Sequence, residues 1–137
     1  MEERTLQTRA ALLSGDRYIR LAAVGRVEDQ ELLACVAQND VNGIVRLAAS
    51  ARVRDQVLLA RLAEHAEDRD VRQEVVVRLD DQATVFRVAE HDVDWRVRRA
   101  AVARVTDQAV LGRVANKDVD GLVRRLARER LVEFVRV

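Results

Sequence analysis

The chain has 137 residues, the length of one ordinary domain, and 49% of them are hydrophobic, which is enough to build a core. Only 3% are aromatic and 34% are charged, so the sequence predicts an aliphatic core beneath a large charged surface, as in an elongated fold. The net charge of +1 excludes a strong bias of the whole molecule toward polyanions, and no apolar run is long enough to span a membrane. The single cysteine, Cys35, excludes an internal disulfide, and the first residues lack a secretory signal, so we expect a cytoplasmic protein.

A period of 26 residues organises the chain, and three sets of residues follow it. The dipeptide Asp-Gln begins at Asp29, Asp55, Asp81 and Asp107. A first arginine column, in which each arginine follows a β-branched residue, contains Arg20, Arg46, Arg72, Arg98 and Arg124. A second arginine column contains Arg26, Arg52, Arg78, Arg104 and Arg130. Three such columns in one chain indicate a tandem repeat.

The period predicts the elements in chain order as units of two short helices. The units are residues 3–28, 29–54, 55–80, 81–106 and 107–131, and residues 132–137 form a C-terminal cap or tail. In the fourth unit Asp81 caps a first helix over 82–91, and Asp94 caps a second helix over 95–105. Four aspartates are expected to cap first helices in this way: Asp29, Asp55, Asp81 and Asp107.

Such short helices need neighbours. A helix of ten residues is only about 15 Å long and is marginal alone in water. If each unit buries its apolar stripe against the next, one core runs along the whole array. The sequence therefore predicts an all-α solenoid that forms a single domain over residues 1–137.

The segment from Asp92 to Val102, with the sequence DVDWRVRRAAV, resembles the core of a HEAT-like repeat, whose pattern is D-x-D-x-x-V-R-x-A-A. The match recurs after Asp40 and after Asp118 and weakens in the third unit, where Ala66 replaces the first aspartate. The resemblance implies a right-handed solenoid of five stacked helix pairs. The unit departs from ordinary HEAT repeats in two ways: it is shorter than their usual length of about 40–47 residues, and it lacks proline. It is also similar to the leucine-rich repeat variant, whose second element can be a 3₁₀-helix. We expect two α-helices in each unit.

The two arginine columns have structural and ligand-binding interpretations. Asp40, Asp92 and Asp118 stand six residues before three arginines of the first column, near first-helix C-termini, where an unpaired negative charge is disfavoured. HEAT-like repeats have an Asp–Arg ladder, and the resemblance implies the same pairs here. The second column lies at second-helix C-termini, where positive charge is favoured and the arginine heads are expected to reach water. In the alternative, either column binds carboxylates or phosphates.

Other side chains are candidates for binding a partner because the repeat does not demand them. Trp95 stands in a column with Gly43, Arg69 and Gly121, and it is either an interface anchor or a packing residue. The arginines of this set are Arg99, Arg125 and Arg128. They lie in a basic C-terminal end: residues 1–95 hold 13 Arg and 18 Asp plus Glu, whereas residues 96–137 hold 11 Arg plus Lys and 5 Asp plus Glu.

The sequence thus predicts a non-catalytic protein-interaction scaffold, with nucleic-acid or polyanion binding through the basic C-terminal end as the alternative. The two histidines and Cys35 lack the spacing of a metal or nucleophile site, so we expect no cofactor. A third possibility, accessory work on a bound cofactor, rests on the HEAT-like resemblance alone. The last residues are apolar for a solenoid end, and they predict a folded-back cap, a cut end of a longer array, or a homo-oligomer contact through Phe134 and Val135.

Overall fold

The computed structural model describes residues 2–136, and within that range it is all α-helical, with ten helices and no strand. The prediction of an all-α fold is therefore confirmed. The helices are α1 (Glu3–Ala11), α2 (Arg17–Val24), α3 (Gln30–Asn39), α4 (Gly43–Arg52), α5 (Gln56–His65), α6 (Arg69–Val76), α7 (Gln82–His91), α8 (Trp95–Val102), α9 (Gln108–Lys117) and α10 (Gly121–Val135).

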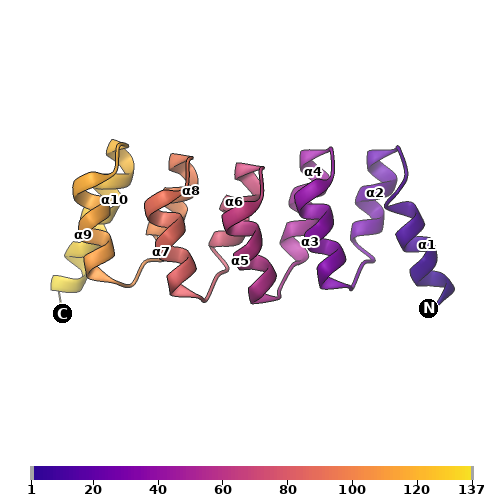
Figure 1. The fold of residues 1–137 in the computed structure, drawn as a ribbon, viewed down its shortest axis with the longest axis horizontal. Coiled ribbons are helices and arrows are strands. Elements are labelled where there is room, and N and C mark those ends of the chain that lie inside the picture. The colour runs from indigo at the N-terminus through magenta and orange to yellow at the C-terminus, as the bar shows by residue number, and fades with distance from the viewer. Residues whose placement is uncertain (1, 137) are drawn as a thin grey trace.

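The helices form an open row of antiparallel pairs, with the two termini at opposite ends (Figure 1). Each odd-numbered helix packs on the even-numbered helix that follows it. Even-numbered helices also pack side by side along the row, and more extensively than α3, α5, α7 and α9 do with one another. Helix α1 leans away from the row and packs mainly on α2 (Figure 1).

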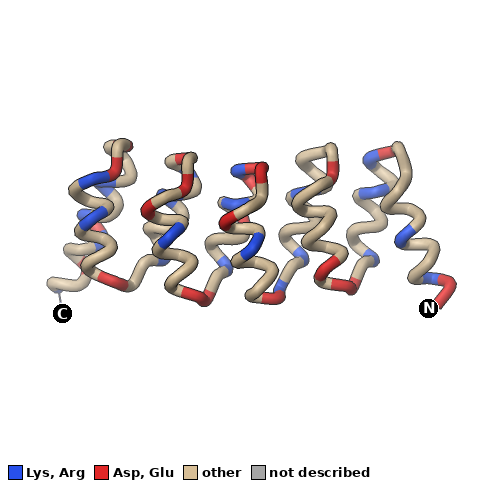
Figure 2. Tube along the Cα trace, viewed as in Figure 1, with Lys and Arg blue, Asp and Glu red and all other residues tan. Residues whose placement is uncertain are grey.

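The helices begin where the sequence places acidic and amide side chains. The carboxylate of Asp29 accepts the backbone N–H of Leu32, and Asp55, Asp81 and Asp107 cap α5, α7 and α9 in the same way. The even-numbered helices are capped by Asp16, Asn42, Asp68, Asp94 and Asp120. Acidic residues accordingly gather at the two ends of the helices (Figure 2). Each such cap stabilises a helix by about 0.5–2 kcal/mol relative to alanine.

The second helices are α-helical but most end earlier than the sequence suggested. Helix α8 ends at Val102, not at Val105, and the next N–H groups bond three residues back: Arg104 to Ala101 at 2.8 Å and Val105 to Val102 at 3.2 Å. This tighter 3₁₀-type turn carries Val105 into the core, where it is fully buried. The same turn follows α2 and α6.

The core is aliphatic and continuous along the row. Its central column consists of Val45, Val71, Val97 and Val123, each at most 1% exposed. Ile19 occupies the same place in α2 but is 47% exposed, because no second helix of an earlier pair lies beside it in residues 2–136. At the N-terminal end of the row this column is therefore only partly covered.

The C-terminal stretch, predicted to be a cap or tail, is helical as far as Val135. Helix α10 continues from Gly121 to Val135, and Phe134 packs half-buried against the core, whereas Val135 is 82% exposed. No aspartate or glycine interrupts the chain after Arg130, and the pair from Arg130 to Glu133, at 3.3 Å, lies within the added turns. Residue 137 of the predicted tail lies outside the described residues.

Candidate partner-binding surface

The first arginine column forms a ladder across neighbouring pairs. Arg98 donates from Nε and Nη2 to the two carboxylate oxygens of Asp118, at 2.8 and 3.2 Å, and from Nη1 to the Asp92 carbonyl at 2.8 Å. Arg20 with Asp40, and Arg72 with Asp92, repeat this two-bond geometry. Each arginine therefore ties the turn of its own pair to the turn of the next pair, and these side chains are buried.

The ladder changes where Ala66 replaces the aspartate. Arg46 there reaches Asp68, the N-cap of α6, at 2.9 Å. Burial pushes the pKa of Asp68 up, but hydrogen bonds from Arg46 and from the Asp70 and Val71 N–H groups outweigh it, so this pKa lies below the ordinary value. Arg124, the last member, donates to the Asp118 carbonyl at 2.6 Å and has no carboxylate partner between residues 2 and 136.

Four of the five arginines of the second column donate to backbone carbonyls, so the expectation that the heads reach water is wrong for these four, whereas Arg26 is exposed. Arg78 donates to the carbonyls of Ser50 and Val53, at 2.6 and 2.7 Å, which belong to the carboxyl end of the preceding second helix. Arg52, Arg104 and Arg130 make equivalent bonds one pair back. Those carbonyls carry the negative end of the helix dipole, so a guanidinium satisfies both charge and hydrogen bonding there.

The glutamine of the Asp-Gln dipeptide has a role that the sequence analysis missed. Gln56 donates from Nε2 to the Arg78 carbonyl at 3.0 Å, and its Oε1 accepts the N–H of Asp80 at 2.9 Å. Gln30 bridges the loop between α4 and α5 in the same manner. The signal was present in the sequence, since the glutamine follows the same period as the capping aspartate.

Charges on the odd-numbered helices are also paired between neighbours. Arg87 reaches Glu64 at 2.7 Å and Arg113 reaches Glu90 at 2.8 Å. The hydrogen bond from Arg113 lowers the pKa of Glu90 against the effect of burial. Because most charges of the repeat are used in this way, the arginines that are not so used become the candidates for contact with a partner.

Two of the arginines predicted to bind a partner lie together. Arg99 and Arg125 line a hollow of about 200 Å³ between α8 and α10, with Leu122, Leu126 and Glu129. Arg125 pairs with Glu129 at 3.2 Å, both side chains being exposed, whereas Arg99 has no hydrogen-bonding partner in the described range. The hollow thus offers guanidinium groups beside exposed leucine.

The other two predicted residues are placed differently. Trp95 is half-buried and packs against the core, and the Arg96 guanidinium lies 5.4 Å from its ring centroid. It precedes Arg99 by one helical turn and so lies on the same side of α8. Arg128 occupies a column that is buried elsewhere, but it is exposed at the open end of the row and donates to the Ala115 carbonyl at 3.2 Å.

An exposed apolar site on α2 and α4 was not predicted. Tyr18 and Ile44 are 67% and 65% exposed and line a hollow of about 100 Å³ with Leu21 and Arg17. Tyr18 and Ile44 share one repeat column, which continues as Asp70, Arg96 and Leu122. The alignment of the repeats placed these residues together, but only their exposure distinguishes them from core residues.

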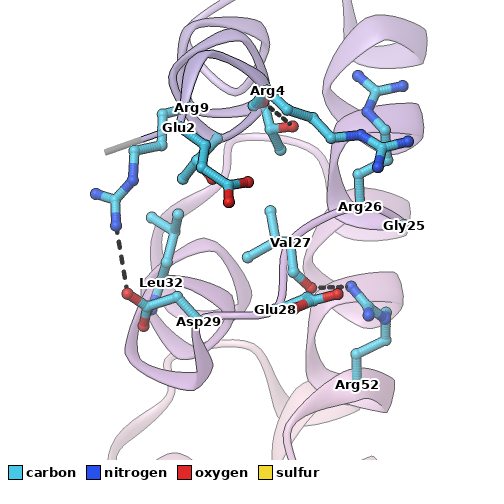
Figure 3. A pocket seen from close by; sticks show the side chains of 12 residues that line it. Glu2, Arg4, Arg9, Gly25, Arg26, Val27, Glu28, Asp29, Leu32 and Arg52 are labelled. Atoms are coloured by element: carbon cyan, nitrogen blue, oxygen red, sulfur yellow. Dashed lines mark hydrogen bonds and ion pairs between the residues drawn. The ribbon is translucent and has the colours of Figure 1, made fainter.

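A further cavity, of about 390 Å³, lies between α1 and the loop from α2 to α3. In Figure 3 the side chains of Arg4 and Arg26 extend toward one another at its rim, and the Glu2 carboxylate points inward. Arg9 pairs with Asp29 across it at 3.3 Å. Since charges of both signs line the cavity, it does not select a ligand of one charge.

Residues 2–136 contain neither a candidate metal-binding group nor a candidate membrane-spanning helix. No group of three or more His, Cys, Asp or Glu side chains there has the geometry to hold a metal ion, and His65, His91 and Cys35 are each exposed. No helix in this range has the length and apolar character needed to cross a membrane.

Comparisons with family models, with curated proteins and with solved structures find no match to this chain.

Proposed function

We propose that this protein is a right-handed solenoid of five HEAT-like repeats that acts as a non-catalytic, cytoplasmic scaffold for another protein. The observation that carries the proposal is the hollow between α8 and α10, where Arg99 and Arg125 meet without any role in joining the repeats. Arginine and tryptophan are enriched at protein–protein contact sites, and Trp95 lies on the same side of α8 as Arg99.

The proposed binding surface consists of the even-numbered helices on the side turned away from the odd-numbered ones. Its residues come from two repeat columns: Tyr18, Ile44, Asp70, Arg96 and Leu122, and Leu21, Leu47, Gln73, Arg99 and Arg125. We call this the second-helix surface. Trp95 borders it and is held against the core, so it offers a rigid aromatic edge to a partner.

Affinity capture of the tagged chain from an extract of its own source, with and without nuclease, tests the proposal. A discrete protein that resists nuclease, and is lost with Arg125→Glu or Trp95→Ala, is the expected result. Lys117→Glu is the matched control, because it makes the same change of charge on α9, away from the second-helix surface. Equal loss with Lys117→Glu would mean that binding depends on overall charge and would contradict the proposal.

A second candidate function is binding of a nucleic acid or another polyanion. Its support is the set of basic side chains on α8 and α10 that stay in solvent contact: Arg96, Arg99, Arg125 and Arg128. Capture that disappears with nuclease, together with an affinity that falls steeply with salt, would favour this function over the scaffold.

Association between copies through Val135 is also part of the proposal, since this side chain ends α10 in solvent while Phe134 packs on its own chain. Light scattering at high concentration is expected to detect a dimer that Val135→Lys removes. A monomer at all concentrations would contradict it.

A further inference from the structure

The second-helix surface changes character along the row. On α2 and α4 its residues are apolar, namely Tyr18, Leu21, Ile44 and Leu47. On α6 they are Asp70 and Gln73, and the Asp70 side chain is exposed. On α8 and α10 arginine predominates, with Arg96, Arg99 and Arg125. The order from the N-terminal to the C-terminal end is therefore apolar, acidic and basic.

Each end of this surface has a place for a side chain. The apolar end has the hollow beside Tyr18 and Ile44, and the basic end has the hollow beside Arg99 and Arg125. Burying Tyr18 and Ile44 would remove exposed apolar area from water, which favours association. Arg99 can offer paired N–H donors to a carboxylate, the strongest arrangement for that group, and Arg125 uses only its Nε on Glu129, so its Nη groups can join Arg99.

The spacing between the hollows limits the partner. Three helix-to-helix steps separate the α2–α4 hollow from the α8–α10 hollow, and packed helices lie about 8–10 Å apart, so the separation is roughly 30 Å. A helix of about 20 residues or an extended strand of about nine residues spans that length.

From this order we infer that the second-helix surface binds one linear segment of another protein, with apolar side chains at one end and carboxylates at the other. The middle of the segment is neutral or basic, because it lies over Asp70. This inference rests on the proposed scaffold function and names the chemistry of the partner.

A selection from a random library of 24-residue peptides on the immobilised full chain tests the inference. Enriched sequences are expected to place leucine-like residues and Asp or Glu at opposite ends. Their affinity is measured by anisotropy of a labelled peptide and, independently, by the fluorescence of Trp95, the single tryptophan of the chain.

Variants of the two ends make the test specific. The double variant Arg99→Glu with Arg125→Glu is expected to bind the acidic peptide more weakly, on the order of tenfold or more. A second peptide, in which lysine replaces the acidic residues, is expected to bind this double variant with restored affinity. Ile44→Asp is expected to lower the affinity for the acidic peptide and for the lysine peptide by the same factor. The matched controls are Lys117→Glu for charge and Val93→Asp for an exposed apolar residue away from this surface.

The outcomes separate the inference from the proposed function. Enrichment without acidic residues, insensitivity to the Arg99 and Arg125 changes, or no enriched peptide at all would overturn the inference. If affinity capture still yields a protein that depends on Arg125, the scaffold function stands and its partner is recognised as a folded surface. If capture yields no such protein, the proposed scaffold function fails together with the inference.

Discussion

Arg46 donates to Asp68, which lies 22 residues further along the chain, whereas the equivalent arginines reach an aspartate 20 residues along. The ladder is therefore maintained by a different residue of the next pair where Ala66 replaces its usual member. Asp68 is also the N-cap of α6, so one carboxylate serves two purposes.

The first prediction separates those two purposes. Asp68→Asn keeps a capping oxygen but removes the charge facing Arg46, and we expect it to lower the free energy of unfolding by about 1–3 kcal/mol. Adding Ala66→Asp to that variant places a carboxylate at the usual ladder position and should restore most of the loss. Urea denaturation measures both, with the exposed Asp70→Asn as a control that stays near the wild-type value. No recovery in the double variant would show that the ladder position is not interchangeable.

The second prediction concerns pH. The pKa of Asp68 lies below its ordinary value of 3.8 in the folded protein, so the unfolded state binds protons more readily. The stability contributed by this carboxylate is therefore fully present above that ordinary value and is lost as the pH falls through the folded pKa. The difference in unfolding free energy between wild type and Asp68→Asn should be constant from about pH 7 to 5 and shrink below about pH 4. If this difference in unfolding free energy persists at the lowest pH, the cost of Asp68→Asn comes from packing and not from the charge of the carboxylate.

The third prediction compares two arginines of the second column. Arg104 donates to the carbonyls of Val77 and Leu79 at the end of the preceding second helix, whereas no second helix precedes the pair of Arg26 among residues 2–136. Arg104→Met should lower the free energy of unfolding by about 1.5–3 kcal/mol, since bonds from a charged donor to helix-end carbonyls are lost. Arg26→Met should change it by less than about 0.5 kcal/mol. Equal effects would mean that the aliphatic stems, not the guanidinium bonds, stabilise the array.

The fourth prediction addresses the glutamines. Gln56→Ala removes a donor and an acceptor that join α5 to the loop after α6, and a loss of about 1 kcal/mol is expected. Gln108 is the matched control, because α10 continues as a helix where the bonded loop would otherwise lie. Chemical denaturation of both variants checks this, and a Gln108→Ala loss as large as that of Gln56→Ala would contradict it.

The sequence predicted most of the local structure of this chain. The helix over 82–91 and the capping role of Asp81 were derived from the residues, because caps and apolar spacing are local signals. The carbonyl partners of Arg78 and the bridging by Gln56 were not predicted, because they depend on which backbone groups a neighbouring pair presents. The exposure of Tyr18 and Ile44 was missed for a related reason: an apolar residue at a helix start is equally compatible with burial.

The partner-binding candidates divide in the same way. Arg99 and Arg125 were chosen because the repeat does not require them, and the structure brings them into one hollow. The same reasoning selected Arg128, which instead faces the open C-terminal end, because a departure from the repeat pattern does not distinguish the end of the row from its side.

The two arginine columns extend in opposite directions along the row. The first column donates forward, to the next pair, at the turns within each pair, and the second donates backward, to the preceding pair, at the opposite ends of the helices. Neighbouring pairs are therefore joined along both edges of the array, so neither a sliding nor a fan-like opening motion can occur without breaking some of these hydrogen bonds. These bonds oppose any change in the distance between Tyr18 and Arg125, so we expect the proposed partner to match that length rather than the array to adjust to it.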